Sequence, residues 1–275
     1  MGHNGSVWDI DISYHTEIIL TGSADNTAKL WNASNGKELY TWTLPSPVRS
    51  VAFSPGNHYV TLTTAKLMGA EPNVYLYPLG EGADQTEQPV VTLRGHTESV
   101  TRILWYPTGD TIITASDDAT LRKWDIETGK QIDEVITHKK GINDAQFSAD
   151  SQQIITASKD MSAKLWDTRS FKEIKRYDTD APVNSAAISP VLPHVVLGGG
   201  QEASMVTTTS DRQGKFQARF YHLIDQEELG RVKGHFGPIN SVAFSPDGKS
   251  YVSGGEDGFV RLHQFDQEYF ERDYD

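Results

Sequence analysis

The fold of this 275-residue chain is decided by residues 95–125, which read GHTESVTRILWYPTGDTIITASDDATLRKWD. Counted from the histidine, this stretch places a serine at +20, an aspartate at +22 and a tryptophan at +28. Three segments share this complete tetrad: His96, Ser116, Asp118, Trp124; His3, Ser23, Asp25, Trp31; and His138, Ser158, Asp160, Trp166. A fourth segment keeps the spacing with His235, Gly255, Asp257 and His263. Such a recurrence indicates an internal repeat.

Two further repeats fill the gaps, since the phrase Val-x-Ser-x-Ala-x-Ser-Pro occurs at 48–55 and 183–190, and again with isoleucine first at 239–246. On that register six aromatic rings mark the repeats: Trp31, Tyr77, Trp124, Trp166, Tyr221 and His263. The stretches from Trp31 to Tyr77 and from Trp166 to Tyr221 contain insertions, at 68–73 and 198–215. The chain therefore carries six visible repeats.

Each repeat has the pattern of about four strands. Short β-rich runs such as 111–115 and 121–124 are bounded by turn sequences such as Ser245-Pro246-Asp247-Gly248. No run has apolar residues at helical spacing over three turns, which argues against alternating strands and helices. Four-stranded units stacked radially cover one another and form a β-propeller. The sequence predicts an all-β propeller forming a single domain over 1–265, followed by an acidic C-terminal tail over 266–275.

The tetrad contains the three side chains of a hydrolase triad. An active site occurs once, however, whereas this set occurs three times and always with a tryptophan, whose buried N–H needs an acceptor. We therefore interpret the tetrads as structural, with the Trp N–H donating to the Ser hydroxyl, Ser bonding one His nitrogen, and the other His nitrogen bonding Asp. No catalytic residue, metal ligand or cofactor site is predicted, since the remaining histidines show no ligand spacing.

Composition excludes several classes of protein. The formal net charge is −12 and there is no cysteine, so disulfides, thiolate metal sites and a cysteine nucleophile are excluded. The acidic balance disfavours direct reading of nucleic acid. The sequence contains neither a long apolar run nor a signal peptide, so it predicts no membrane contact and a cytoplasmic protein.

The repeats resemble those of WD-repeat proteins, in the Gly95-His96 pair and in Trp followed by Asp or Asn at 31–32, 124–125 and 166–167. A closer resemblance lies in Gly-Gly-Gly-Gln-Glu-Ala at 198–203, Thr207-Thr208-Thr209, and the segments 230–238 and 253–261. These segments are similar to the i subunit of eukaryotic translation initiation factor 3. Family members begin with one more repeat before the one at His3, so the resemblance implies a seven-bladed fold that lacks its first blade here.

The resemblance implies a non-catalytic scaffold that binds the b and g subunits of the factor and contacts the small ribosomal subunit indirectly, through the complex. It also implies a role in mRNA scanning and start-codon selection. Asp150 and Asp167 match acidic positions that receive a C-terminal helix of the b subunit. Two alternatives stay open from the residues: another WD-repeat adaptor of the kinase-receptor-associated type, and a propeller enzyme with its site at the channel mouth. Both carboxylates also have an ordinary interpretation as turn residues.

Overall fold

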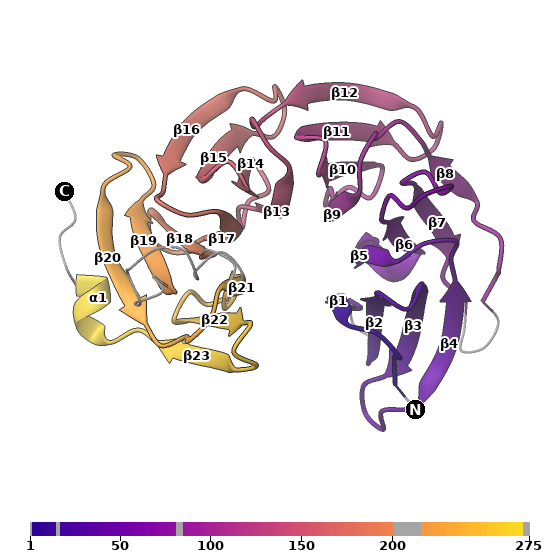
Figure 1. The fold of residues 1–275 in the computed structure, drawn as a ribbon, viewed down its shortest axis with the longest axis horizontal. Coiled ribbons are helices and arrows are strands. Elements are labelled where there is room, and N and C mark those ends of the chain that lie inside the picture. Colours follow the sequence, from indigo (N-terminus) through magenta and orange to yellow (C-terminus); the bar gives the residue numbers. More distant parts are fainter. Residues whose placement is uncertain (1, 15–16, 81–84, 201–215, 272–275) are drawn as a thin grey trace. The chain divides into compact units, whose positions relative to one another are not determined.

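The computed structural model describes residues 2–14, 17–80, 85–200 and 216–271, and the regular secondary structure of these residues is almost entirely β-strand (Figure 1). The strands form six antiparallel sheets, each made from consecutive strands. The only helical elements among the described residues are the short η1 (Pro55–Asn57) and α1 (Gln267–Glu271). The predicted fold class is confirmed: the protein is all-β and consists of six blade sheets of the β-propeller type.

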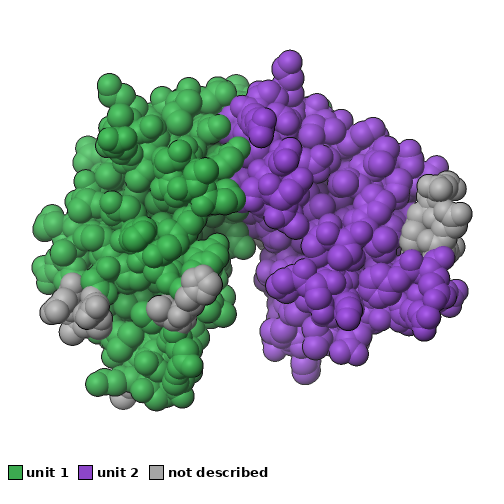
Figure 2. All heavy atoms as spheres, turned by 180° about the vertical axis from the view of Figure 1, so that it is seen from behind, with its two compact units in different colours: residues 1–142 green, residues 143–275 purple. Residues whose placement is uncertain are grey.

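The chain divides into two compact units, Met1–Ile142 and Asn143–Asp275, which Figure 2 distinguishes by colour. The first unit contains three four-stranded sheets. Sheet 1 consists of β1 (Val7–Ile12), β2 (Ile18–Ser23), β3 (Thr27–Asn32) and β4 (Glu38–Thr43); sheet 2 of β5 (Val48–Phe53), β6 (Tyr59–Thr64), β7 (Val74–Pro78) and β8 (Val91–Leu93); sheet 3 of β9 (Val100–Trp105), β10 (Thr111–Ser116), β11 (Thr120–Asp125) and β12 (Gln131–Ile136).

The second unit begins at Asn143, within the first strand of sheet 4. The first residue of that strand, Ile142, is the last residue of the first unit. Sheet 4 consists of β13 (Ile142–Phe147), β14 (Gln153–Ser158), β15 (Ser162–Asp167) and β16 (Glu173–Asp178); sheet 5 of β17 (Val183–Ile188), β18 (His194–Gly199), β19 (Gln217–His222) and β20 (Glu228–Lys233); sheet 6 of β21 (Ile239–Phe244), β22 (Ser250–Gly255) and β23 (Val260–Gln264). Sheet 6 thus has three described strands where the repeat pattern predicts about four. The tail at 266–275, predicted only as acidic, includes α1.

Apolar side chains of the strands form a core between neighbouring sheets within each unit. Between sheets 1 and 2 the buried residues include Leu20, Leu30 and Val51, and between sheets 5 and 6 they include Val196, Ile239 and Tyr251. The short β-rich runs of the sequence form strands because their apolar side chains pack against cross-strand neighbours and against the next sheet. The core therefore lies between blades, as radial stacking requires.

Side chains also join the first strands of neighbouring sheets, which share no backbone ladder. In the second unit, Asn143 Nδ2 donates to the Val183 carbonyl oxygen at 2.9 Å, and Asn184 Nδ2 donates to the Ile239 carbonyl oxygen at 3.1 Å. In the first unit, Asp9 accepts hydrogen bonds from the Ser50 hydroxyl at 2.7 Å and from the Val51 N–H at 3.0 Å. These bonds place the starts of the first strands in each unit side by side.

Candidate functional site

Three members of the sheet 3 tetrad form a buried chain of hydrogen bonds with Thr114. His96 Nδ1 lies 2.8 Å from Asp118 Oδ2, and His96 Nε2 lies 2.7 Å from Thr114 Oγ1. Trp124 Nε1 donates to the same threonine oxygen at 2.9 Å. An ionised carboxylate only accepts, so Nδ1 of a neutral His96 carries the proton and Nε2 accepts from the Thr114 hydroxyl. Every polar group in this chain has a partner.

Bonds of the same kind occur in sheets 1, 4 and 6. In sheet 1 the Trp31 N–H donates to Thr21 at 2.8 Å, and His3 Nε2 lies 2.7 Å from the same hydroxyl oxygen. In sheet 4 the Trp166 N–H donates to Thr156 at 3.0 Å, and His138 is buried. Sheet 6 uses a serine at the equivalent position, because His235 Nε2 lies 2.9 Å from Ser253 Oγ. A hydroxyl at +18 from the histidine is therefore the common element.

The prediction that the serine of each tetrad accepts from the tryptophan is wrong. Ser116 instead accepts from the Asp118 N–H and donates to the Glu98 carbonyl oxygen, each at 3.1 Å. Ser23 and Ser158 likewise accept the N–H of the tetrad aspartates Asp25 and Asp160. The serines stabilise the turn between the second and third strands.

Strand register explains the difference. Trp124 pairs directly with Ile112 across β10 and β11, so Thr114 is its diagonal neighbour on the same face of the sheet. Ser116 lies two residues further along β10, roughly 6.6 Å away by the rise of a strand. The indole N–H reaches the nearer hydroxyl. A threonine at +18 occurs in all three complete segments, so the sequence did contain the signal for Thr21, Thr114 and Thr156.

The carboxylate of the tetrad is strongly held in its ionised form. Burial alone would raise the pKa of Asp118, but hydrogen bonds from His96, the Thr120 hydroxyl and the Thr97 N–H outweigh it and hold that pKa well below its usual range. The pKa values of Asp25 and Asp257 are lowered in the same way by their own histidines and turn N–H groups. The imidazole is thus engaged on both nitrogens and does not activate the serine hydroxyl.

Asp150 and Asp167 lie at one end of sheet 4. Asp150 is in the turn between β13 and β14, and Asp167 is the last residue of β15, paired with Gln153 at the start of β14. In each residue Oδ1 accepts local hydrogen bonds: Asp150 from Ser148 and Gln152, and Asp167 from the side chain and N–H of Ser170. These bonds lower the pKa of both carboxyl groups, so both are ionised at neutral pH.

The neighbouring end of sheet 5 carries exposed apolar side chains. Val191 follows β17 and is 53% exposed, and Ile224 follows β19 and is 58% exposed. Val191 lies against the turn of sheet 6, since a Cβ on Gly248 would meet its Cγ2 at 2.4 Å. The turn ends of sheets 4 and 5 therefore present two carboxylates beside exposed apolar side chains.

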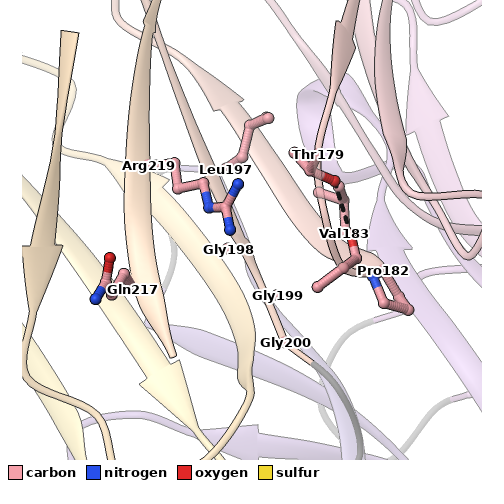
Figure 3. Close-up of a pocket in the computed structure, with 10 residues that line it drawn as sticks. Thr179, Pro182, Val183, Leu197, Gly198, Gly199, Gly200, Gln217 and Arg219 are labelled. Atoms are coloured by element: carbon pink, nitrogen blue, oxygen red, sulfur yellow. Dashed lines mark hydrogen bonds between the residues drawn. The ribbon is translucent and has the colours of Figure 1, made fainter. Parts of the chain in front are cut away.

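The Gly198-Gly199-Gly200 run lies in a small pocket at the opposite end of sheet 5 (Figure 3). A Cβ on Gly198 would lie 2.7 Å from Ile239 Cγ2, and one on Gly199 would lie 2.2 Å from the Pro182 carbonyl oxygen. Glycine at these two positions lets β18 approach its neighbours closely. Arg219 lines the pocket and forms an ion pair with Asp180. The rest of the predicted insertion, 201–215, lies outside the described residues.

Within the described ranges, no group of three or more His, Cys, Asp or Glu side chains is placed to hold a metal ion. The same residues contain no helix long and apolar enough to cross a membrane.

Comparison with known proteins decides the family. The family model EIF3I matches residues 1–275. The chain belongs to the EIF3I family. It is 48% identical over 275 residues to the eukaryotic translation initiation factor 3 subunit I of Taeniopygia guttata, covering all of this chain and 85% of that protein. The subunit I proteins of Bombyx mori and Homo sapiens are 48% and 46% identical, and the matches cover all of this chain and 84% and 85% of those proteins. The predicted resemblance to this family is confirmed.

Proposed function

We propose that this chain is a non-catalytic scaffold subunit of eukaryotic translation initiation factor 3. The single observation that carries the proposal is membership of the EIF3I family over the whole chain, whose relatives are named as subunit I of that factor. In this role it binds the b and g subunits in the cytoplasm, meets the small ribosomal subunit through the complex, and supports mRNA scanning and start-codon selection. The relatives' names describe a subunit, which favours this role over that of an enzyme or another adaptor.

Asp150 and Asp167 are the proposed contacts for a C-terminal helix of the b subunit. Their position at one end of sheet 4 supports the proposal, because two ionised carboxylates on one surface suit Arg or Lys side chains of a docking helix. The internal hydrogen bonds of both residues use Oδ1, which leaves Oδ2 to accept from a partner. The apolar side chains of Val191 and Ile224 would contact the apolar face of such a helix.

The test is a titration of the double variant Asp150→Lys, Asp167→Lys with a peptide from the C-terminal end of the b subunit. We expect binding at least tenfold weaker than that of the unchanged protein, with circular dichroism confirming the fold. The matched control is Asp110→Lys, Asp125→Lys in sheet 3. Asp125 occupies the place of Asp167, and Asp110 lies in the turn between β9 and β10, two positions beyond the place of Asp150; both accept hydrogen bonds from nearby turn residues. Unchanged affinity of the sheet 4 variant, or an equal loss in the control, would contradict a docking site at sheet 4.

A further inference from the structure

A short C-terminal segment, residues 266–271, lies against sheet 5 although it belongs to no sheet. It includes α1 and follows Phe265, whose N–H donates to the Lys249 carbonyl oxygen at 3.0 Å, directly beyond the last pair of β22 and β23. Within the described ranges, no strand forms a ladder with residues 266–271. The attachment of this segment to the second unit therefore depends on side chains.

Tyr269 makes the contact with sheet 5. Its hydroxyl oxygen lies 2.7 Å from Nδ1 of His194, the first residue of β18, and the two rings meet edge to face with their centroids 5.3 Å apart. His194 is fully buried. The Tyr269 ring also stacks on Phe265, with centroids 4.0 Å apart and an angle of 11° between the planes. Phe265 packs against the core between sheets 5 and 6, so Tyr269 joins the segment both to that core and to β18.

The other residues of the segment are exposed: Asp266, Gln267, Glu268, Phe270 and Glu271. Two of their hydrogen bonds stay within the segment, since Asp266 Oδ1 accepts the Tyr269 N–H at 3.0 Å and Gln267 Nε2 donates to Glu271 Oε1 at 2.5 Å. A helix of five residues is not stable by itself. Three carboxylates and no Lys or Arg also gain no general attraction from a chain of net charge −12. Attachment therefore depends mainly on the ring and the hydroxyl of Tyr269.

His194 is also the last residue of the loop 189–194, which joins β17 to β18 and carries the exposed Val191. The His194 N–H donates to the Leu192 carbonyl oxygen at 2.7 Å. The Ser189 hydroxyl oxygen accepts the N–H groups of Val191 and Leu192 at 3.4 and 3.3 Å, which are long hydrogen bonds. A contact on the His194 ring therefore bears directly on the order of this loop.

We propose that residues 266–271 form a releasable strap, which Tyr269 latches to His194, and that the attached strap orders the loop 189–194. Release breaks the stack on Phe265 and the hydrogen bond to His194 without breaking any strand ladder, so it costs far less than unfolding a sheet. It uncovers the face of Phe265 that Tyr269 covers. The turn end of sheet 5 then has two states, one with an ordered loop and one with a mobile loop and a larger apolar surface.

The experiment is amide hydrogen exchange followed by mass spectrometry on the full 275-residue chain. Tyr269→Phe keeps the ring and removes the hydroxyl, and we expect amides of 266–271 and of the loop 189–194 to exchange at least threefold faster. Tyr269→Ala removes the ring as well, and the increase should reach at least tenfold. The matched control is Tyr75→Phe, which removes a hydroxyl that accepts from Asn73 Nδ2 at 3.2 Å in sheet 2. It should leave exchange in both segments unchanged.

Each other outcome overturns a part of the proposal. Equal exchange rates in the unchanged protein and both Tyr269 variants would show that Tyr269 is not the latch. Faster exchange of 266–271 with an unchanged loop would show that the strap does not order residues 189–194. Exchange in β18 and β22 should stay slow in every variant, because release leaves the sheets intact. If Tyr269→Ala instead loses its circular dichroism spectrum, the segment is part of the folded core and is not a releasable strap.

Discussion

Replacing Thr114 by valine tests the hydrogen-bond chain most directly. Valine has nearly the shape of threonine but no hydroxyl, so the change removes one oxygen and leaves the packing in place. The Trp124 N–H would lose its acceptor and His96 Nε2 would lose its donor. Thr114 is fully buried, and the other two side chains are almost fully buried, so water does not replace the lost bonds.

The expected cost follows from those two groups. A buried polar group left without a partner costs about 1 to 3 kcal/mol, so the pair of Trp124 and His96 gives about 2 to 6 kcal/mol for Thr114→Val. Thr114→Ser keeps the hydroxyl and deletes one buried methyl group, for about 1 kcal/mol. Ser116→Ala should also cost about 1 kcal/mol, because it loses bonds to backbone groups that are only partly buried.

Urea unfolding of the three variants checks this order. With a denaturant slope of about 3 kcal/mol per molar, a loss of 3 kcal/mol lowers the midpoint by about 1 M. Thr114→Val should therefore unfold at clearly lower urea than either of the other two variants. A urea midpoint for Thr114→Val equal to that of Thr114→Ser would refute the role of this hydroxyl. A lower midpoint for Ser116→Ala than for Thr114→Val would show that the serine, and not the threonine, is the essential hydroxyl.

Two further predictions concern the tetrad carboxylate and the glycine run. Because the pKa of Asp118 in the folded protein lies below its ordinary value of 3.8, its stabilising effect is complete above about pH 4 and is lost as the pH falls. Asp118→Asn should therefore make the unfolding free energy less dependent on pH below 4, and an unchanged slope in acid urea titrations would contradict this. Gly199→Ala should lower the unfolding free energy by about 1 to 3 kcal/mol, since its Cβ would overlap the Pro182 carbonyl oxygen. Gly230→Ala, with no atom near its Cβ, is the control and should not lose stability.

Much of the fold could be predicted from the sequence because the same short strand pattern occurs in every repeat. The runs at 111–115 and 121–124 are each short, but recurrence at one spacing fixes their order and their antiparallel pairing. The three-stranded sheet 6 and α1 were not predicted, because the repeat pattern ends at His263 and local periodicity over 266–275 is too short to read. Alternation of antiparallel strands puts the turn that holds Asp150 and the end of the strand that holds Asp167 at one end of a sheet, and the observed register agrees.

The tetrads show where pattern reasoning fails. Ser116 stands out because it recurs beside the tight turn at Asp118, and Thr114 was overlooked because threonine is common in strands. Choosing between them requires the cross-strand partner of Trp124, and that register depends on which residues form the turn between β10 and β11.

The asparagine bonds between first strands have a mechanical consequence. Within a sheet, neighbouring strands are joined by rows of backbone bonds that fix their spacing and angle. Between sheets of the second unit, Asn143 and Asn184 each provide a link through a side chain with rotatable torsions. Such a link tolerates a change of angle that a backbone ladder resists. We therefore expect a bound partner to change the angle between neighbouring sheets of this unit more easily than the spacing of strands within a sheet. The strands within each sheet should keep their register.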